Sequence, residues 1–277
     1  MHPLRARLIE LTALTAALAA VVSLLDGPSY WAGQAVVVVA AGLGMLMLLA
    51  DREPRGVPLE SLALPAVAAF TTAGLPHLAG VGPWWLPALA AGAALLVLAG
   101  GTEARLLGPV DERRAQAERQ LQPLTVLVAF AAFVAAAGAI PGGLAEPAAA
   151  GGTPANPVLA LGGLSVERSS LLALGLLDAL IAFVLGYRLA ALRTTSAREA
   201  AWAAGTFAVV IGIGAALLRG FGLPRLVAPA VLAGVFYLWS AYRGASAAQR
   251  RSFAWLWEYA LLGGALVVAV AWYLLVH

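Results

Sequence analysis

Long apolar runs separated by short polar connections repeat along the whole of this 277-residue chain. A helix needs about 20 residues to cross roughly 30 Å of hydrocarbon, and a barrel strand would need strict in–out alternation. The runs lack that alternation and have the helical length. They lie at about residues 8–25, 31–50, 59–79, 84–102, 122–140, 168–192, 198–218, 224–242 and 254–276. The pattern predicts an all-α, polytopic transmembrane helical bundle with about nine spans, forming a single domain over residues 1–277.

The connections between these runs alternate in charge. All 17 basic residues are arginine, and 14 of them lie on alternate connections, whereas Arg168, Arg219 and Arg225 lie on the others. Short arginine-rich loops stay in the cytoplasm. The 14 are Arg5, Arg7, Arg52, Arg55, Arg105, Arg113, Arg114, Arg119, Arg188, Arg193, Arg198, Arg243, Arg250 and Arg251. We therefore expect a cytoplasmic N-terminus, an outside C-terminus and a multi-pass location in a cell membrane of the bacterial inner-membrane type.

The amino-acid composition excludes several kinds of binding and catalytic site. The chain is 62% hydrophobic and 11% charged, and it contains neither cysteine nor lysine. Disulfides, thiolate metal sites, Schiff bases and a phosphate-loop lysine are thereby excluded, since each needs one of those side chains. The arginines are spread along membrane connections rather than gathered on one soluble face, so the basic pI near 9.7 does not indicate a nucleic-acid partner.

Two long connections interrupt the pattern. The charged segment 103–121 places Arg114 and Glu118 four residues apart, and we expect a solvated helix that runs into the fifth span and bends or restarts at Pro123. The glycine- and proline-rich segment 141–166 is predicted to be an irregular outer loop.

Two spans share a short sequence likeness. Residues 62–67, LALPAV, resemble residues 226–231, LVAPAV, and the two spans cross in opposite senses. Inverted halves 1–102 and 168–277 joined by span 122–140 would have the arrangement of many secondary transporters, with Pro65 and Pro229 as matched kinks near a central site. Chance is the alternative, because these residue types are common in this composition.

Asp178 is the acidic residue that lies well inside a predicted span. It is about ten residues, or roughly 15 Å, from the outer end of the sixth run. A carboxylate at such depth costs a few kcal/mol unless it is protonated, paired or wetted, so it marks a candidate transport site. The alternative is a neutral Asp178 that only fixes helix packing. Arg219, near the outer end of the seventh run, is the most plausible ion partner.

Aromatic and charged residues gather near the predicted inner edge of the last run. Arginine and aromatic side chains can hold an anionic lipid headgroup, although an ordinary aromatic belt beside cytoplasmic arginines gives the same pattern. The candidates are Arg243, Arg250, Arg251, Trp255, Trp257 and Glu258. Glu10 is another acidic residue near the inner edge of a predicted run. We expect it to form an ion pair with Arg7, which is three residues away.

The remaining polar and small residues predict packing rather than chemistry. The three histidines lie outside the predicted spans, so neither a metal site nor another cofactor is expected. Thr71, Thr72 and Thr206 are expected to bond within their own helices or to a neighbour, as hydroxyls in lipid do. Small residues that would allow close helix approach are Gly42, Gly44, Ala208, Gly212, Ala260 and Gly264.

Three function classes differ in what they require. A permease-like protein that moves a small solute, ion or lipid needs a polar path near Asp178 and Arg219. A non-catalytic accessory or scaffold subunit needs apolar, glycine-bearing faces for partner membrane subunits, besides the surrounding lipids. An intramembrane enzyme is the least favoured, because neither membrane face carries an acidic cluster. The sequence favours the permease-like hypothesis, since Asp178 otherwise has no reason to be there.

Overall fold

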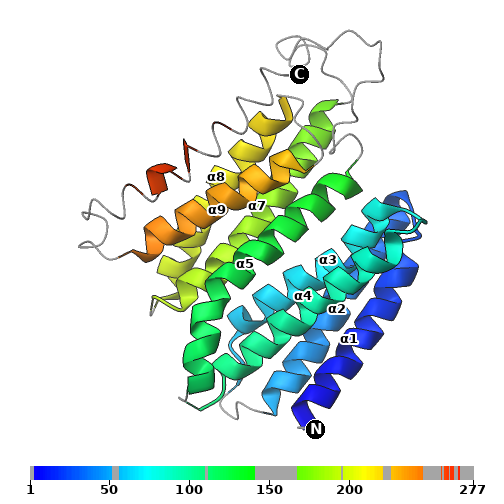
Figure 1. Ribbon diagram of the computed structural model, residues 1–277, viewed down its shortest axis with the longest axis vertical. Coiled ribbons are helices and arrows are strands. Elements are labelled where there is room, and N and C mark those ends of the chain that lie inside the picture. The colour runs from blue at the N-terminus through cyan, green and yellow to red at the C-terminus, as the bar shows by residue number, and fades with distance from the viewer. Residues whose placement is uncertain are drawn as a thin grey trace.

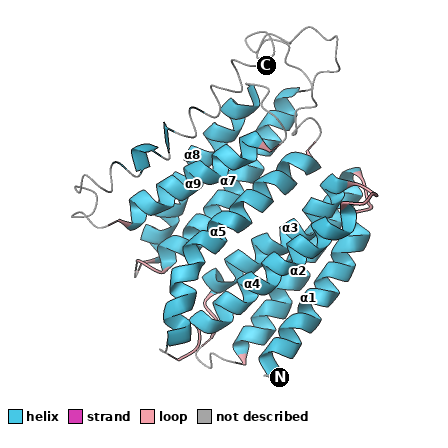
Figure 2. Ribbon diagram, in the orientation of Figure 1, coloured by secondary structure: helices cyan, strands magenta, loops and turns pink. Residues whose placement is uncertain are grey.

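The computed structural model describes residues 3–51, 56–109, 112–140, 167–194, 196–220 and 226–245, with residues 257, 259–261, 263, 264 and 268. Every regular element in this part of the chain is a helix (Figure 2). The helices are α1 (Pro3–Val22), α2 (Gly27–Ala50), η1 (Leu59–Leu62), α3 (Ala63–Ala79), α4 (Trp85–Leu106), α5 (Glu112–Ala139), α7 (Glu167–Ala191), α8 (Ala197–Gly220) and α9 (Val227–Gly244). The predicted all-α class is confirmed.

Six of these helices are long and apolar enough to cross a membrane: α2, the η1–α3 segment, α4, α5, α7 and α8. The first helix carries Arg5, Arg7 and Glu10 within its first eight residues, and polar side chains lower the mean hydropathy of α9. The predicted run 254–276 falls largely outside the described residues, as does the loop 141–166. The count of nine spans and the orientation of the termini therefore remain predictions.

The helices form two groups that lie side by side. Helices α1–α4 make one group and α5, α7, α8 and α9 the other (Figure 1). Helix α3 is the centre of the assembly, since it contacts α1, α2, α4, α5 and α7. Its apolar window is 67% buried, against 28% for that of α8, so α3 is an interior helix and α8 a peripheral one.

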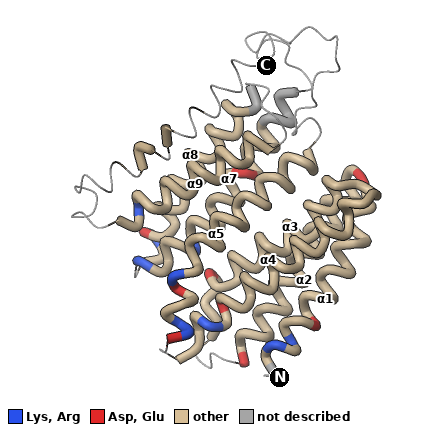
Figure 3. Tube along the Cα trace, in the orientation of Figure 1, with Lys and Arg blue, Asp and Glu red and all other residues tan. Residues whose placement is uncertain are grey.

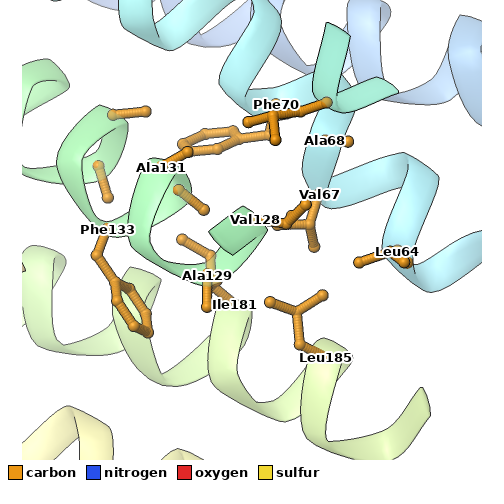
Figure 4. Packing of buried hydrophobic residues seen from close by; sticks show 14 of the residues in the cluster. Leu64, Val67, Ala68, Phe70, Val128, Ala129, Ala131, Phe133, Ile181 and Leu185 are labelled. Carbon is orange, nitrogen blue, oxygen red and sulfur yellow. The ribbon is translucent and has the colours of Figure 1, made fainter. Parts of the chain in front are cut away.

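Apolar side chains of α3, α5 and α7 join the two groups. Leu64, Val67 and Phe70 of α3 face Val128, Ala129 and Ala131 of α5, and Ile181 and Leu185 of α7 complete the layer (Figure 4). Alanine supplies most of the contact on α5, which lets the helix axes approach closely. The interface is packed with hydrocarbon, so any polar group buried in it needs a specific explanation.

The outside of the bundle is also apolar. Leu14, Met47 and Leu176 are each about 70% exposed, and valine, leucine and isoleucine side chains on other helices point outward in the same way. A soluble protein of this size would rarely expose so much contiguous hydrocarbon. The six long apolar helices and this outer surface together fit a multi-pass membrane protein.

Glycines bring some helices into backbone contact. A methyl group added at Gly92 of α4 would meet the backbone of Thr72 in α3, and one at Gly212 of α8 would meet the carbonyl of Gly175 in α7. Gly44 lies against Leu11 of α1. Gly42 has no neighbour within 4 Å, so the expectation that it serves close packing inside this chain is wrong. Gly42 is half-buried and follows the buried Ala41, so it lies at the edge of the buried face of α2, where no other described helix approaches it.

The prolines sit differently from the predicted matched kinks. Pro65 and Pro229 are each the third residue of their helix, α3 and α9, where a missing backbone N–H leaves no bond broken. Pro123 instead lies inside α5, and the axis of that helix changes direction in Figure 1. A proline removes one backbone hydrogen bond and clashes with the preceding turn, which explains the predicted bend.

Charged residues follow the predicted alternation of ends. Among the described residues, arginines gather at the end of the bundle that holds the start of α1 and the start of α5 (Figure 3). Arg114 and Glu118 form the expected pair, with 3.3 Å between Nε and Oε1. Arg7 pairs with Asp51 at the end of α2 and not with Glu10, because α1 and α2 are antiparallel neighbours and bring those two side chains together.

We predict that Gly92→Ala destabilises the protein by about 1–3 kcal/mol, because the new methyl group meets backbone that cannot move aside. Gly42→Ala is the matched control. It should be neutral or stabilising by up to about 1 kcal/mol, since the site is open and alanine favours a helix. Thermal unfolding in detergent measures both, and equal effects of the two variants would contradict the packing described.

Candidate functional site

Asp178 lies in the middle of the buried face of α7. Its exposed fraction is 2%, and its neighbours on the same face, Leu174, Ile181 and Leu185, belong to the hydrophobic core. One carboxylate oxygen, Oδ1, is buried and has no hydrogen-bond partner among the described residues. An unpartnered carboxylate oxygen inside hydrocarbon is costly in any protein, so this group is either neutral or served by a ligand.

Arg219 is offset from Asp178 along the helices. Ala179, the residue after Asp178, lies level with Gly212 of α8. Arg219 is seven residues further along α8, or about 10 Å along the axis, and its side chain is outside the described part of the structure. The structure therefore does not bring the two residues to one level, and their pairing remains a prediction.

A buried ion pair is the feature that the sequence analysis missed. Glu103 of α4 and Arg188 of α7 form a two-pronged contact, with 2.8 Å from Nε to Oε1 and 2.6 Å from Nη2 to Oε2. The Glu103 side chain is fully buried and that of Arg188 is 5% exposed. The planar guanidinium fork matches a carboxylate in two parallel bonds, the strongest geometry for such a pair.

The pair escaped notice because both residues lie close to predicted run ends. The apolar pattern ends the fourth run at residue 102, which leaves Glu103 on a polar connection, and the charge pattern groups Arg188 with the cytoplasmic arginines. In the structure α4 continues to Leu106 and α7 to Ala191, so both charges lie on helices inside the bundle. An acidic residue directly after an apolar run was the available signal.

The ion pair joins the two helix groups at the arginine-rich end. Glu60 of η1 is a second carboxylate that acts electrostatically on Glu103, and η1 also contacts α7. The contact of α4 with α7 is therefore made by charge, whereas the rest of the interface is hydrocarbon.

Asp178 and Arg188 mark two levels of α7. They are ten residues apart, about 15 Å along the axis, and both face the interior. Ile181 and Leu185 lie between them and pack against α3 and α5 (Figure 4). The interior surface of α7 thus carries a carboxylate, an apolar layer and a paired cation in that order.

Other hydrogen bonds tie α9 to this end of the bundle. Gln122 Nε2 of α5 donates to Ser240 Oγ at 3.1 Å, and Arg193 Nη1 donates to the Ser240 carbonyl at 3.3 Å. Partial desolvation lowers the pKa of the Arg193 guanidinium from its ordinary value, although arginine stays charged. The arginine-rich end is consequently held by several polar contacts between helices.

A second polar cluster joins the ends of α1, α2, α3 and α4 at the opposite end of the bundle. We call it the Tyr30 cluster, and its members are Ser23, Tyr30, Gln34, His77 and Trp85. The ring of Tyr30 stacks on His77 at 4.0 Å, His77 Nδ1 donates to the Ser23 carbonyl at 3.0 Å, and Trp85 Nε1 donates to Ser23 Oγ at 3.1 Å. The expectation that His77 lies outside the spans is wrong, because His77 belongs to the last turn of α3. Neither Tyr30 nor Gln34 had a predicted role.

The structure describes only some of the other residues that the sequence analysis singled out. The threonine expectation is confirmed, since Thr71, Thr72 and Thr206 each bond a carbonyl of their own helix. Arg243 is exposed at the end of α9 and Trp257 is 58% exposed. The other lipid-headgroup candidates, Arg250, Arg251, Trp255 and Glu258, lie outside the described residues. That candidate site remains a prediction.

An open cavity of about 590 Å³ lies along the start of α5. Its lining residues are Glu112, Ala115, Gln116, Arg119, Gln120 and Pro123, all of one helix. Asp178 does not line it. Among the described residues no group of three histidine, aspartate or glutamate side chains is placed to hold a metal ion.

Comparison with known protein families, with curated proteins and with solved structures gives no match to this chain.

We predict that Arg188→Met destabilises the protein by about 3–5 kcal/mol, because it leaves the Glu103 carboxylate buried without its cation. The double variant Glu103→Leu/Arg188→Met should recover most of that loss, since hydrocarbon replaces both charges. Thermal unfolding in detergent measures the cycle.

The exposed pair Arg114–Glu118 supplies the control for that cycle. Glu118→Gln should cost only about 0.3–0.5 kcal/mol, the usual value for an exposed i,i+4 pair. If Arg188→Met costs no more than this control, the Glu103–Arg188 pair is not a buried ion pair in the protein.

Proposed function

We propose that this chain is a permease-like protein of the cell membrane, of the bacterial inner-membrane type, which moves a small solute, an ion or a lipid with Asp178 as its intramembrane polar site. The observation that carries the proposal is the Asp178 carboxylate, 2% exposed with Oδ1 unpartnered, in the middle of α7. Intramembrane carboxylates of this kind are expensive and are usually kept for ion or proton handling.

The layered interior of α7 supports a gating arrangement. Asp178 would receive the solute or proton from the outer half of the bundle, where Arg219 at the end of α8 would help attract an anionic group. The apolar layer of Ile181 and Leu185 and the Glu103–Arg188 pair would close the inner half. Movement of α1–α4 against α5 and α7–α9 would then open one half and close the other, as in transporters built from two repeats.

The two-group architecture bears on the proposed inverted halves 1–102 and 168–277. Helix α5 contacts α3 and α4 as well as α7 and α9, which is compatible with a connector between the two proposed halves. The inverted repeat itself stays part of the proposal.

An accessory or scaffold subunit is the second candidate function, and one surface favours it. The outward side of α2 carries Val36, Val39, Leu43 and Met47, each more than half exposed, and the open Gly42 lies at the edge of this stripe. Small-residue notches on apolar faces are where membrane helices associate, so another membrane subunit would fit there beside the lipids. Partner capture through α2 without any flux would favour this function over the permease.

We expect Asp178→Asn to reduce flux at least about tenfold while the protein stays folded, because an amide carries no negative charge and cannot take up and release a proton. The measurement uses purified protein in vesicles with an entrapped pH-sensitive dye under an imposed potential, followed by stopped-flow swelling with small neutral solutes. The control is Glu118→Gln, which changes an exposed carboxylate on α5. Undiminished flux in Asp178→Asn would remove Asp178 from the mechanism, and absence of flux in the native protein would reject the permease.

The orientation can be tested directly because the chain contains no cysteine. Single cysteines can be placed at two exposed positions that lie at opposite ends of the bundle. One is Val81, which is 89% exposed in the turn between α3 and α4, and the other is Gln116 on α5. We expect a membrane-impermeant maleimide added to intact cells to label Val81→Cys, and to label Gln116→Cys only after the cells are broken. The reverse pattern would invert the predicted orientation.

A further inference from the structure

Two buried oxygen atoms of the Tyr30 cluster have no hydrogen-bond partner within the part of the chain that the structure describes. They are Tyr30 Oη and Gln34 Oε1, on side chains that are 1% and 3% exposed. Tyr30 and Gln34 are four residues apart, on the buried face of α2. Buried side-chain oxygens are nearly always hydrogen-bonded in proteins, so two orphaned atoms one turn apart need a common explanation.

Both side chains reach the same turn of α3. Gln34 Nε2 donates to the carbonyl of Phe70 at 2.6 Å. A methyl group added at Gly74, four residues after Phe70, would lie 3.6 Å from Tyr30 Oη. The tyrosine hydroxyl and the glutamine amide therefore flank the Phe70–Gly74 turn.

Neither side chain is free to turn toward another partner. The Tyr30 ring is stacked on His77, which is itself bonded to the Ser23 carbonyl. The Gln34 amide is planar, and its NH₂ group faces the Phe70 carbonyl, so Oε1 has to point away from that carbonyl. The positions of the two orphaned oxygens are thus set by contacts on other elements.

We infer that the Phe70–Gly74 turn of α3 and the side chains of Tyr30 and Gln34 form a binding site for one water-sized, neutral hydrogen-bond donor. An amide oxygen only accepts, so the guest must donate to Gln34 Oε1, whereas the tyrosine hydroxyl can donate or accept. Water and ammonia have this chemistry. A cation does not fit, because no member of the Tyr30 cluster carries a carboxylate to balance its charge. The inference does not depend on the permease proposal.

The sign of one substitution tests the site. If a guest bonds the hydroxyl, Tyr30→Phe strands that guest and lowers the Tm in detergent by roughly 2–4 °C. If no guest is there, the same change removes an orphaned buried hydroxyl, and the Tm stays the same or rises. A constant or higher Tm overturns the inference.

A double-variant cycle tests whether one guest serves both atoms. Gln34→Met also loses the bond to Phe70, but that loss cancels in the cycle with Tyr30→Phe. A shared guest predicts that the Tm change of the double variant is smaller than the sum of the two single changes. Tyr187→Phe, on the half-buried ring that faces Phe183 in α7, is the control partner and should be additive with Gln34→Met. Additivity of Tyr30→Phe with Gln34→Met contradicts a shared guest.

A spectroscopic measurement covers the case in which Tyr30→Phe does not fold. The ultraviolet resonance Raman doublet of tyrosine reports hydroxyl hydrogen bonding. The difference between the spectra of the native protein and Gln34→Met should show that one tyrosine hydroxyl changes its hydrogen bonding. An unchanged doublet overturns the site.

Adding ammonium chloride at alkaline pH, with sodium chloride as the control, distinguishes water from ammonia as the guest. A Tm increase in the native protein that is absent from Gln34→Met identifies ammonia, and no increase identifies water.

Discussion

Hydrocarbon on both the inside and the outside of the bundle is the constraint on which this structure depends. Backbone N–H and C=O groups that find no water on either side must bond one another, and only a continuous helix satisfies them within one segment. That is why the described chain is helical almost without interruption and why its turns are short. With apolar side chains on all faces, hydrophobicity cannot distinguish the interior from the lipid-facing side, so small residues and a few polar groups determine which helices meet.

The buried polar groups therefore carry most of the specificity of the assembly. The Glu103–Arg188 pair joins α4 to α7, and the Tyr30 cluster joins the ends of α1, α2, α3 and α4. Each of these contacts removes charge or hydrogen-bonding capacity from water, and that cost is recovered only in one arrangement of the helices. Asp178 differs from them, because none of the described residues bonds its Oδ1. A group that is left unsatisfied by the fold is the natural place to look for function.

The residues of the interior also show how a moving element could be built. Helix α7 contacts α3, α5, α8 and α9, so it is held from several sides, yet its link to α4 is a single ion pair rather than interlocking hydrocarbon. An ion pair can switch between two discrete states, formed and broken. Closely packed side chains have no such second state and resist displacement. The proposed gating role of Glu103 and Arg188 rests on that difference.

The sequence by itself determined the helical class, the positions of eight helices and the place of Asp178 well inside one of them, because run length and hydropathy are local properties. It also predicted the Arg114–Glu118 pair, which is set by helical spacing alone. Only the tertiary structure decided that Arg7 meets Asp51, that Glu103 meets Arg188, that Gly92 rather than Gly42 is packed against a neighbour, and that Tyr30 and Gln34 flank one turn of α3. These contacts join residues far apart in the chain. Since hydrocarbon covers every helix face alike, no local pattern could say which faces would meet.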